Sequence, residues 1–288
     1  MSDMAISRRP AGRALIYAVL GMFVAFYLAP LIVVALNSVR SVAEISRTSV
    51  LGIPQALHLE NWAIAWGRYC MASVCEGVRP YMWNSAVMTV PATLLSTLLG
   101  AISGYALSMW RFPGANWLFG VITLGVFLPV HMKLVPWALS LRALGLSESI
   151  GGLILIHVVQ GLSFTILFCR NYYVAIPEDL IKAARVDGAG FFRIFWRIVL
   201  PLSPPILIVC VIWQFTGIWN EYLFGSTFSS RDTKPVTAAL ISFSATIAQA
   251  REYGVEAAAV LIAAMPTLLI YIVGGKFFVR GLTAGAVK

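Results

Sequence analysis

The 288-residue sequence contains little charge. Asp, Glu, Lys and Arg make up 11% of it, whereas a soluble globular domain carries about 25%. Hydrophobic residues account for 59%, and the mean hydropathy is +0.84. This balance excludes a soluble globular protein and predicts an integral membrane protein. The formal net charge of +9 does not indicate nucleic-acid binding, because Lys and Arg in a membrane protein mainly set its orientation.

The sequence also lacks the motifs of a self-contained enzyme. Gly274-Gly275-Lys276 is followed by Phe277 and has neither the earlier Gly nor the following Ser or Thr of a phosphate-binding loop. No nucleophile–base–acid set stands out, and no cysteine spacing suggests a zinc site. These absences argue against an enzyme, and we expect no metal or cofactor in this chain.

Long apolar segments dominate what is present. They suit membrane-spanning helices, which need roughly 20 residues, and are too continuous for the strands of a barrel. The polar start and long first apolar run are not those of a cleavable signal. We predict an all-α polytopic fold, a single transmembrane domain over residues 1–288 with external loops near 38–81 and 225–255. The six expected spans lie near residues 14–37, 82–109, 116–140, 150–170, 200–224 and 256–279.

The distribution of Lys and Arg predicts the orientation. Six spans place both termini on one side, where twelve of these residues fall, against eight on the other side and Lys133 inside the third span. Because basic loops stay in the cytoplasm, both termini are predicted to be cytoplasmic. The N-terminal segment 1–13 and the loop at about 171–199 then face the cytoplasm as well.

The polar loop between the fourth and fifth spans is the most informative stretch. Pro177 favours the first turn of a helix, and negative charge at Glu178 and Asp179 stabilises a helix N-terminus. Gly188 is typical of a helix end, so a short helix with small residues in its middle is predicted. Residues 191–199 form a second, basic and aromatic amphipathic segment suited to the membrane interface. The alternative is a surface helix that merely connects two spans.

Along this loop come Ala183-Ala184, Gly188 after three further residues, Ile198 after nine more, and then Leu200-Pro201. This spacing resembles the cytoplasmic signature of the permease subunits of ABC importers. In that family the loop is the docking socket for a separate ATPase subunit, so the resemblance implies the same role here. Lys182 stands where the family usually has Glu, so the ion pair of that Glu is not expected. The residues to which this coupling role is assigned are Pro177, Glu178, Asp179, Lys182, Ala183, Ala184, Asp187, Gly188, Ile198, Leu200 and Pro201.

Other stretches resemble the carbohydrate-uptake branch, in the smaller permease type of the maltose transporters. They are Trp83-Asn84-Ser85, Gly104-Tyr105-Ala106-Leu107, Arg111-Phe112-Pro113-Gly114, Trp219-Asn220-Glu221-Tyr222 and the C-terminal Val279–Lys288. The resemblance implies the type I importer fold in a bacterial inner membrane and an ATP-driven sugar importer of which this chain forms half the pathway. The implied partners are a second permease, an ATP-binding subunit dimer that holds ATP and Mg, an extracytoplasmic sugar-binding protein and membrane lipid.

The substrate and the path residues are open at this stage. The external segment 68–80 resembles that of glucose and mannose permeases, so such a monosaccharide or another sugar is expected. Asn84, Trp219, Asn220 and Glu221 are candidates to line the path, because polar and aromatic side chains bond to and stack on sugars. The alternative is that Asn84 bonds between helices and that Glu221 is an interfacial residue holding a loop.

A few further residues have two readings each. His131 and Lys133 lie between Pro129 and Pro136, where they either line a water-filled cavity or belong to a proton relay that lacks a second acid. Cys70 and Cys75 lie in an external, oxidising loop and are either a local disulfide or two free thiols. Cys169 and Cys210 sit in apolar surroundings and are expected to be packing residues. The competing functional hypothesis is a self-sufficient secondary transporter or intramembrane enzyme, which leaves the loop at 178–201 unexplained.

Overall fold

The computed structural model describes residues 10–70, 75–110, 112–244 and 252–284, and all the regular elements in these ranges are helical. The chain divides into two compact units. Unit 1 comprises Met1–Val78 and Phe243–Ile262, and unit 2 comprises Arg79–Ser242 and Ala263–Lys288. The helices in chain order are α1 (Pro10–Asn37), α2 (Val42–Arg47), α3 (Glu60–Gly67), α4 (Arg79–Met109), α5 (Ala115–Phe127), η2 (Val130–Lys133), α6 (Leu134–Ala143), α7 (Ile150–Tyr173), α8 (Glu178–Val186), α9 (Phe191–Ile194), η3 (Phe195–Val199), α10 (Leu200–Leu202), α11 (Pro204–Trp219), α12 (Leu223–Phe228), α13 (Val236–Ser244) and α14 (Tyr253–Ala284).

Four of these helices are long and apolar enough to cross a membrane by themselves, and two bent pairs bring the number of candidate spans to six. The first, second, fourth and sixth predicted spans correspond to α1, α4, α7 and α14. Pro30, Pro91 and Pro266 lie inside continuous helices, as expected for a membrane protein.

The third predicted span is not one straight helix. It consists of α5 and a second segment, Val130–Ala143, which are bent by 108° relative to each other. The bend follows from Pro129, because the residue before a proline is driven out of the helical region, and Leu128 is extended with φ −67° and ψ 123°. The fifth predicted span is also bent, by 81° between Phe191–Leu202 and Pro204–Trp219. Its helix α11 ends at Trp219, so residues 220–224 lie outside the helix that was expected to contain them.

Unit 1 is organised around a buried arginine. The side chain of Arg40 is 0% exposed, and its Nη1 donates to Asn37 Oδ1 at 2.8 Å and to the Ser49 carbonyl at 3.0 Å. Its remaining nitrogens donate to the Glu44 carboxylate at 3.4 Å and to the Thr48 hydroxyl. A buried charge is tolerated only when it is paired and hydrogen-bonded, and these contacts tie the end of α1 to α2. Cys70 and Cys75, in the same unit, are joined by a disulfide.

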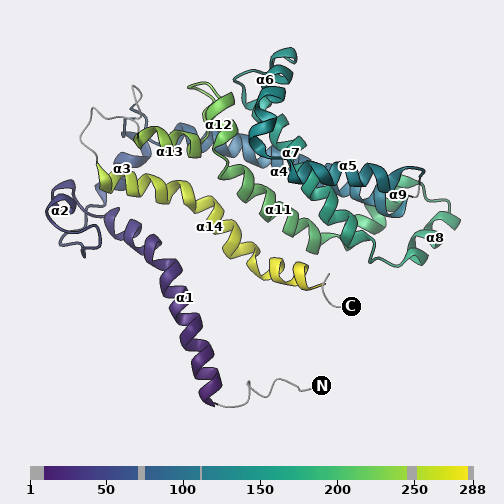
Figure 1. Cartoon of the computed structure of the whole chain (residues 1–288), viewed down its shortest axis with the longest axis horizontal. Helices are drawn as coiled ribbons and strands as arrows, with labels where there is room; N and C mark the ends of the chain where they lie inside the picture. The colour runs from purple at the N-terminus through teal and green to yellow at the C-terminus, as the bar shows by residue number, and fades with distance from the viewer. Residues whose placement is uncertain (1–9, 71–74, 111, 245–251, 285–288) are drawn as a thin grey trace. The chain divides into compact units, whose positions relative to one another are not determined.

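Unit 2 is built on close packing of α4 against α7, which lie side by side (Figure 1). Small residues permit the approach, because a Cβ on Gly104 would lie 2.8 Å from Cys169 Cβ and 2.9 Å from the backbone nitrogen of Arg170. Thr165 Oγ1 donates to the Ser96 carbonyl at 3.0 Å across the same interface. Cys169 on α7 and Cys210 on α11 are both buried, with their sulfurs 4.0 Å apart. The core of this unit therefore joins three helices.

Gly104→Ala should destabilise unit 2, because the added methyl would overlap backbone that cannot rotate away, and overpacking costs about 1–3 kcal/mol. The matched control is Gly120→Ala on α5, where an added Cβ meets nothing within 4 Å. Thermal unfolding of the purified variants in mild detergent, followed by tryptophan fluorescence, should show a lower Tm for Gly104→Ala only. Equal melting temperatures would contradict the close α4–α7 contact.

Candidate functional site

The predicted loop helix is present as α8, from Glu178 to Val186. Pro177 stands immediately before its first residue, and Glu178 and Asp179 occupy the first turn. At the other end the N–H of Gly188 donates to the Arg185 carbonyl at 3.0 Å, and the N–H of Ala189 donates to the Ala184 carbonyl at 2.9 Å. This pair of bonds is a Schellman motif, which needs a left-handed residue. Gly188 supplies it, with a φ of +76°.

One face of α8 is anchored in the core of unit 2. Ile181 is 4% exposed and Ala184 is 9% exposed, and both belong to the apolar cluster that contains Tyr173 and Ile194. Ala183 is exposed, so the two adjacent alanines face in different directions. The expected Ala-rich docking face is therefore narrower than the sequence indicates. It retains Ala183 and the neighbouring Val186, which is 88% exposed.

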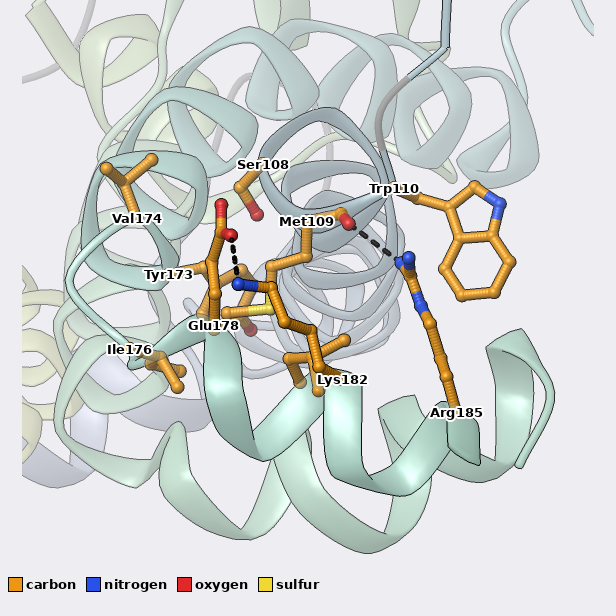
Figure 2. A pocket seen from close by; sticks show the side chains of 10 residues that line it. Ser108, Met109, Trp110, Tyr173, Val174, Ile176, Glu178, Lys182 and Arg185 are labelled. Carbon is orange, nitrogen blue, oxygen red and sulfur yellow. Dashed lines mark hydrogen bonds and ion pairs between the residues drawn. The ribbon is translucent and has the colours of Figure 1, made fainter. Parts of the chain in front are cut away.

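Arg185 ties α8 to the end of α4. Its Nη2 donates to the Met109 carbonyl at 3.0 Å, and its guanidinium carbon lies 4.3 Å from the centre of the Trp110 ring (Figure 2). A cation stacked on an aromatic face contributes roughly 0.5–1 kcal/mol at exposed sites. The sequence does not predict this contact, because Trp110 is 75 positions away from Arg185 in the chain. From the sequence alone, only the position of Arg185 in the last turn of the predicted helix can be recognised.

Lys182 forms ion pairs within α8. Its Nζ lies 3.3 Å from Glu178 Oε2 and 3.6 Å from Asp179 Oδ1, and Figure 2 shows the first of these pairs as a dashed line. All three side chains are more than half exposed, so the pairs contribute little to stability. They do neutralise part of the acidic first turn. The substitution of Lys for the expected Glu therefore changes the charge that α8 presents.

A cavity of about 510 Å³ lies between α8 and the ends of α4 and α7. Polar groups of Ser108, Tyr173 and Glu178 line it together with the aliphatic side chains of Val174 and Ile176 (Figure 2). α8 is thus joined to the spans at its anchored face and at Arg185, with a hollow between the two attachments.

The segment after Gly188 is amphipathic, as predicted, but its helix is irregular. Ile194, Phe195 and Val199 are fully buried, whereas Phe192 is 64% and Trp196 is 48% exposed. Residues 195–199 form a π-helical turn, a feature that recurs at functional sites. The coupling residues Ile198 and Leu200 are half-buried, and Pro201 is exposed just before the bend at Ser203.

The four path candidates lie near the other ends of α4 and α11, and three of them bond to the protein itself. Asn84 Nδ2 donates to the carbonyls of Asp232 at 2.8 Å and Lys234 at 3.1 Å. Trp219 is 3% exposed and its Nε1 donates to the Ala263 carbonyl at 2.9 Å. Asn220 is exposed. The amide of Asn84 thus secures a loop rather than a neighbouring helix.

Glu221 caps α12. Its two carboxylate oxygens accept from the Phe224 N–H at 2.9 Å, and Oε2 also accepts from the Gly225 N–H at 3.2 Å. Burial raises the pKa of the Glu221 carboxyl, and the backbone N–H bonds oppose that rise. Negative charge is favourable at a helix N-terminus, so the carboxylate holds the α11–α12 turn.

Lys133 and His131 lie at the break between α5 and α6. His131 is exposed, whereas Lys133 is half-buried and reaches α7, where its Nζ lies 2.7 Å from Gln160 Oε1. Among the described residues no group of three or more His, Cys, Asp or Glu side chains could hold a metal ion. Two expected elements, Arg111 and the last residues of the C-terminal tail, 285–288, lie outside the described residues.

Comparison with known proteins identifies a matching family and several similar proteins. The model of the family described as "Binding-protein-dependent transport system inner membrane component" matches residues 96–280. The diacetylchitobiose uptake system permease protein of Streptomyces coelicolor is 30% identical over 96% of this chain and 89% of its own length. The xylose/arabinose import permease protein of Haloferax volcanii is 28% identical over 94% of this chain and 92% of its own.

A solved structure shares the fold. The crystal structure of a bacterial ABC transporter involved in the import of the acidic polysaccharide alginate superposes with a TM-score of 0.78 at 22% identity, covering 96% of this chain and all of that one.

Replacing Glu221 by Ala should loosen α12, because losing a helix N-cap costs about 0.5–2 kcal/mol, which corresponds to roughly 2- to 30-fold faster local opening. Hydrogen–deuterium exchange of residues 223–228 in the purified chain measures this opening. The neighbouring exposed Asn220→Ala serves as the control and should leave exchange unchanged. Unaltered exchange in Glu221→Ala would show that the Glu221 carboxylate does not hold α12.

Proposed function

Because the chain belongs to the family of inner membrane components of binding-protein-dependent transport systems, we propose that it is the permease subunit of an ATP-driven sugar importer and forms half of the translocation pathway. As a multi-pass transport subunit of this family it is not an enzyme. The observation that carries the proposal is α8, a short exposed helix joined firmly to two spans.

The ATPase subunit docks on the exposed side of α8. Ile181 and Ala184 fix the opposite side in the core, and Arg185 fixes the helix to Met109 and Trp110. A displacement of α8 would therefore move the ends of α4 and α7 together. The docking surface comprises Pro177, Glu178, Asp179, Lys182, Ala183, Asp187 and Gly188, and the segment with Ile198, Leu200 and Pro201 passes the movement to α11.

The chain works with partner subunits that bind ATP, deliver the substrate and form the second half of the pathway. ATP and Mg are bound by a dimer of ATP-binding subunits, and a sugar-binding protein delivers the substrate from outside the bacterial inner membrane. A second permease completes the pathway. Membrane lipid surrounds the apolar spans, among them α1, which is long and apolar enough to cross a membrane by itself. The excess of Lys and Arg on the side of α8 favours cytoplasmic termini.

The substrate is a sugar. The two sequence relatives named above are permease proteins for diacetylchitobiose and for xylose or arabinose, so the family accommodates both disaccharides and monosaccharides. The external segment 68–80, which contains the Cys70–Cys75 disulfide, resembles that of glucose and mannose permeases. We therefore propose a monosaccharide of the glucose or mannose type as the first candidate substrate.

Affinity purification of the chain from its native membrane in mild detergent, followed by mass spectrometry, tests the proposal most directly. Co-purification of a second six-span permease and of a subunit with a phosphate-binding loop is the expected result. Recovery of the chain alone, or only as a homo-oligomer, would favour a secondary transporter instead.

Gly188→Asp should leave membrane insertion intact and uncouple transport from ATP hydrolysis. The left-handed backbone at residue 188 costs a non-glycine residue roughly 1–2 kcal/mol, and the new charge lies beside Asp187 on the docking surface. Uptake of radiolabelled sugar and ATPase activity are measured in proteoliposomes that contain all subunits.

The matched control for this experiment is Gly190→Asp. Gly190 has a φ of −79°, an ordinary value for any residue, and an added Cβ there meets nothing within 4 Å. Transport at the wild-type rate by Gly188→Asp would show that α8 is not the coupling element.

A further inference from the structure

Lys133 occupies an unusual place, at the break of a membrane span. It is the last residue of η2, at the 108° bend between α5 and α6. Its side chain crosses to α7, where Nζ donates to Gln160 Oε1 at 2.7 Å, and it also lies 3.4 Å from the Gly125 carbonyl in the last turn of α5. Three elements of unit 2 thus meet at one ammonium group.

The partners of this ammonium are neutral. An amide oxygen and a backbone carbonyl accept from Lys133, and none of the carboxylates in the described ranges forms an ion pair with it. A cation within a span is costly, and such residues face the interior of a bundle or a water-filled cavity. Since the described part of the chain provides no counter-charge, the charge of Lys133 is only partly compensated, by the carbonyl end of α5.

The cluster presents hydrogen-bond donors. A lysine ammonium can only donate, so Gln160 must turn its amide oxygen towards Lys133, which leaves both N–H groups of that amide for another partner. Lys133 has three N–H bonds and two acceptors among the described residues, and Gln160 is only half-buried. A ligand that fits here carries acceptor atoms and, because the cluster is positive, a negative charge.

We propose that Lys133 and Gln160 form a subsite in the transport path that binds the anionic group of an acidic sugar, a carboxylate such as that of a uronic acid. This inference rests on the proposed importer function and narrows its substrate class to acidic relatives of a monosaccharide. The carboxylate accepts from the Lys133 ammonium and from the Gln160 amide, in a charge-assisted pair that a neutral sugar cannot form.

The test compares glucuronate with glucose. Radiolabelled binding is measured on the purified importer complex, and uptake is measured in proteoliposomes. The wild-type complex should bind glucuronate about tenfold or more tightly than glucose, the factor that one charge-assisted hydrogen bond supplies. Lys133→Met should bring the two affinities close together, and Lys133→Arg should preserve the preference. Arg142→Gln, which removes an exposed positive charge from α6, is the matched control and should behave as wild type.

Gln160→Glu keeps the test decisive if Lys133→Met fails to fold. This change preserves the shape of the side chain and places a carboxylate beside Lys133, where it competes with the ligand. We expect loss of the preference for glucuronate with normal assembly. An unchanged preference in a well-folded Gln160→Glu complex would show that Lys133 merely holds the end of α5, and would overturn the proposal.

The remaining outcomes separate this inference from the function on which it rests. Uptake of glucose with no preference for glucuronate, unaffected by Lys133→Met, refutes the subsite and leaves the importer intact. A complex that lacks an ATPase subunit and transports no sugar refutes the function itself. Glucose 6-phosphate bound as tightly as glucuronate, in a manner that depends on Lys133, supports an anion subsite that does not distinguish carboxylate from phosphate.

Discussion

A bilayer offers the polypeptide backbone no hydrogen-bonding partner, and the rest of this structure depends on that constraint. All regular elements in the described ranges are helical, so most backbone groups are satisfied within their own segment. Where a span breaks, side chains replace the lost bonds. Lys133 reaches the Gly125 carbonyl at one break, and Ser203 Oγ donates to the Val199 carbonyl at 2.5 Å at the other. Both breaks lie beside residues to which we assign functions.

The second break lies next to the anchored helix α8. Ser203 Oγ is also within 3.1 Å of the Tyr173 hydroxyl, and Tyr173 belongs to the apolar cluster that contains Ile181 of α8. The hinge of the fifth span, the end of the fourth and the loop helix thus share one buried core. Interiors packed in this way transmit strain instead of absorbing it, which suits a part that must convert movement of a docked subunit into movement of the spans.

Local signals predicted α8 well and the breaks poorly. The acidic first turn and Gly188 define α8 by interactions within a few residues, so sequence alone located its ends. Prolines gave no such guidance, because Pro30, Pro91 and Pro266 lie in continuous helices while Pro129 ends one. Whether a proline breaks a span depends on what neighbouring helices can offer the freed carbonyls, and that is a tertiary property. Ala184 likewise faces the core because of tertiary packing, which the residue type alone does not reveal.

Partners far away in the chain explain why the sequence alone could not assign the roles of Asn84 and Trp219. Asn84 bonds to backbone 148 and 150 positions later, and Trp219 bonds to a carbonyl 44 positions later, so no local pattern could show that their polar groups are occupied. Lys133 differs, because its partners leave donors available. The same residue types therefore serve opposite purposes. Where donors and acceptors balance within the chain, a polar side chain fixes the fold, and where donors remain in excess it is suited to bind a ligand.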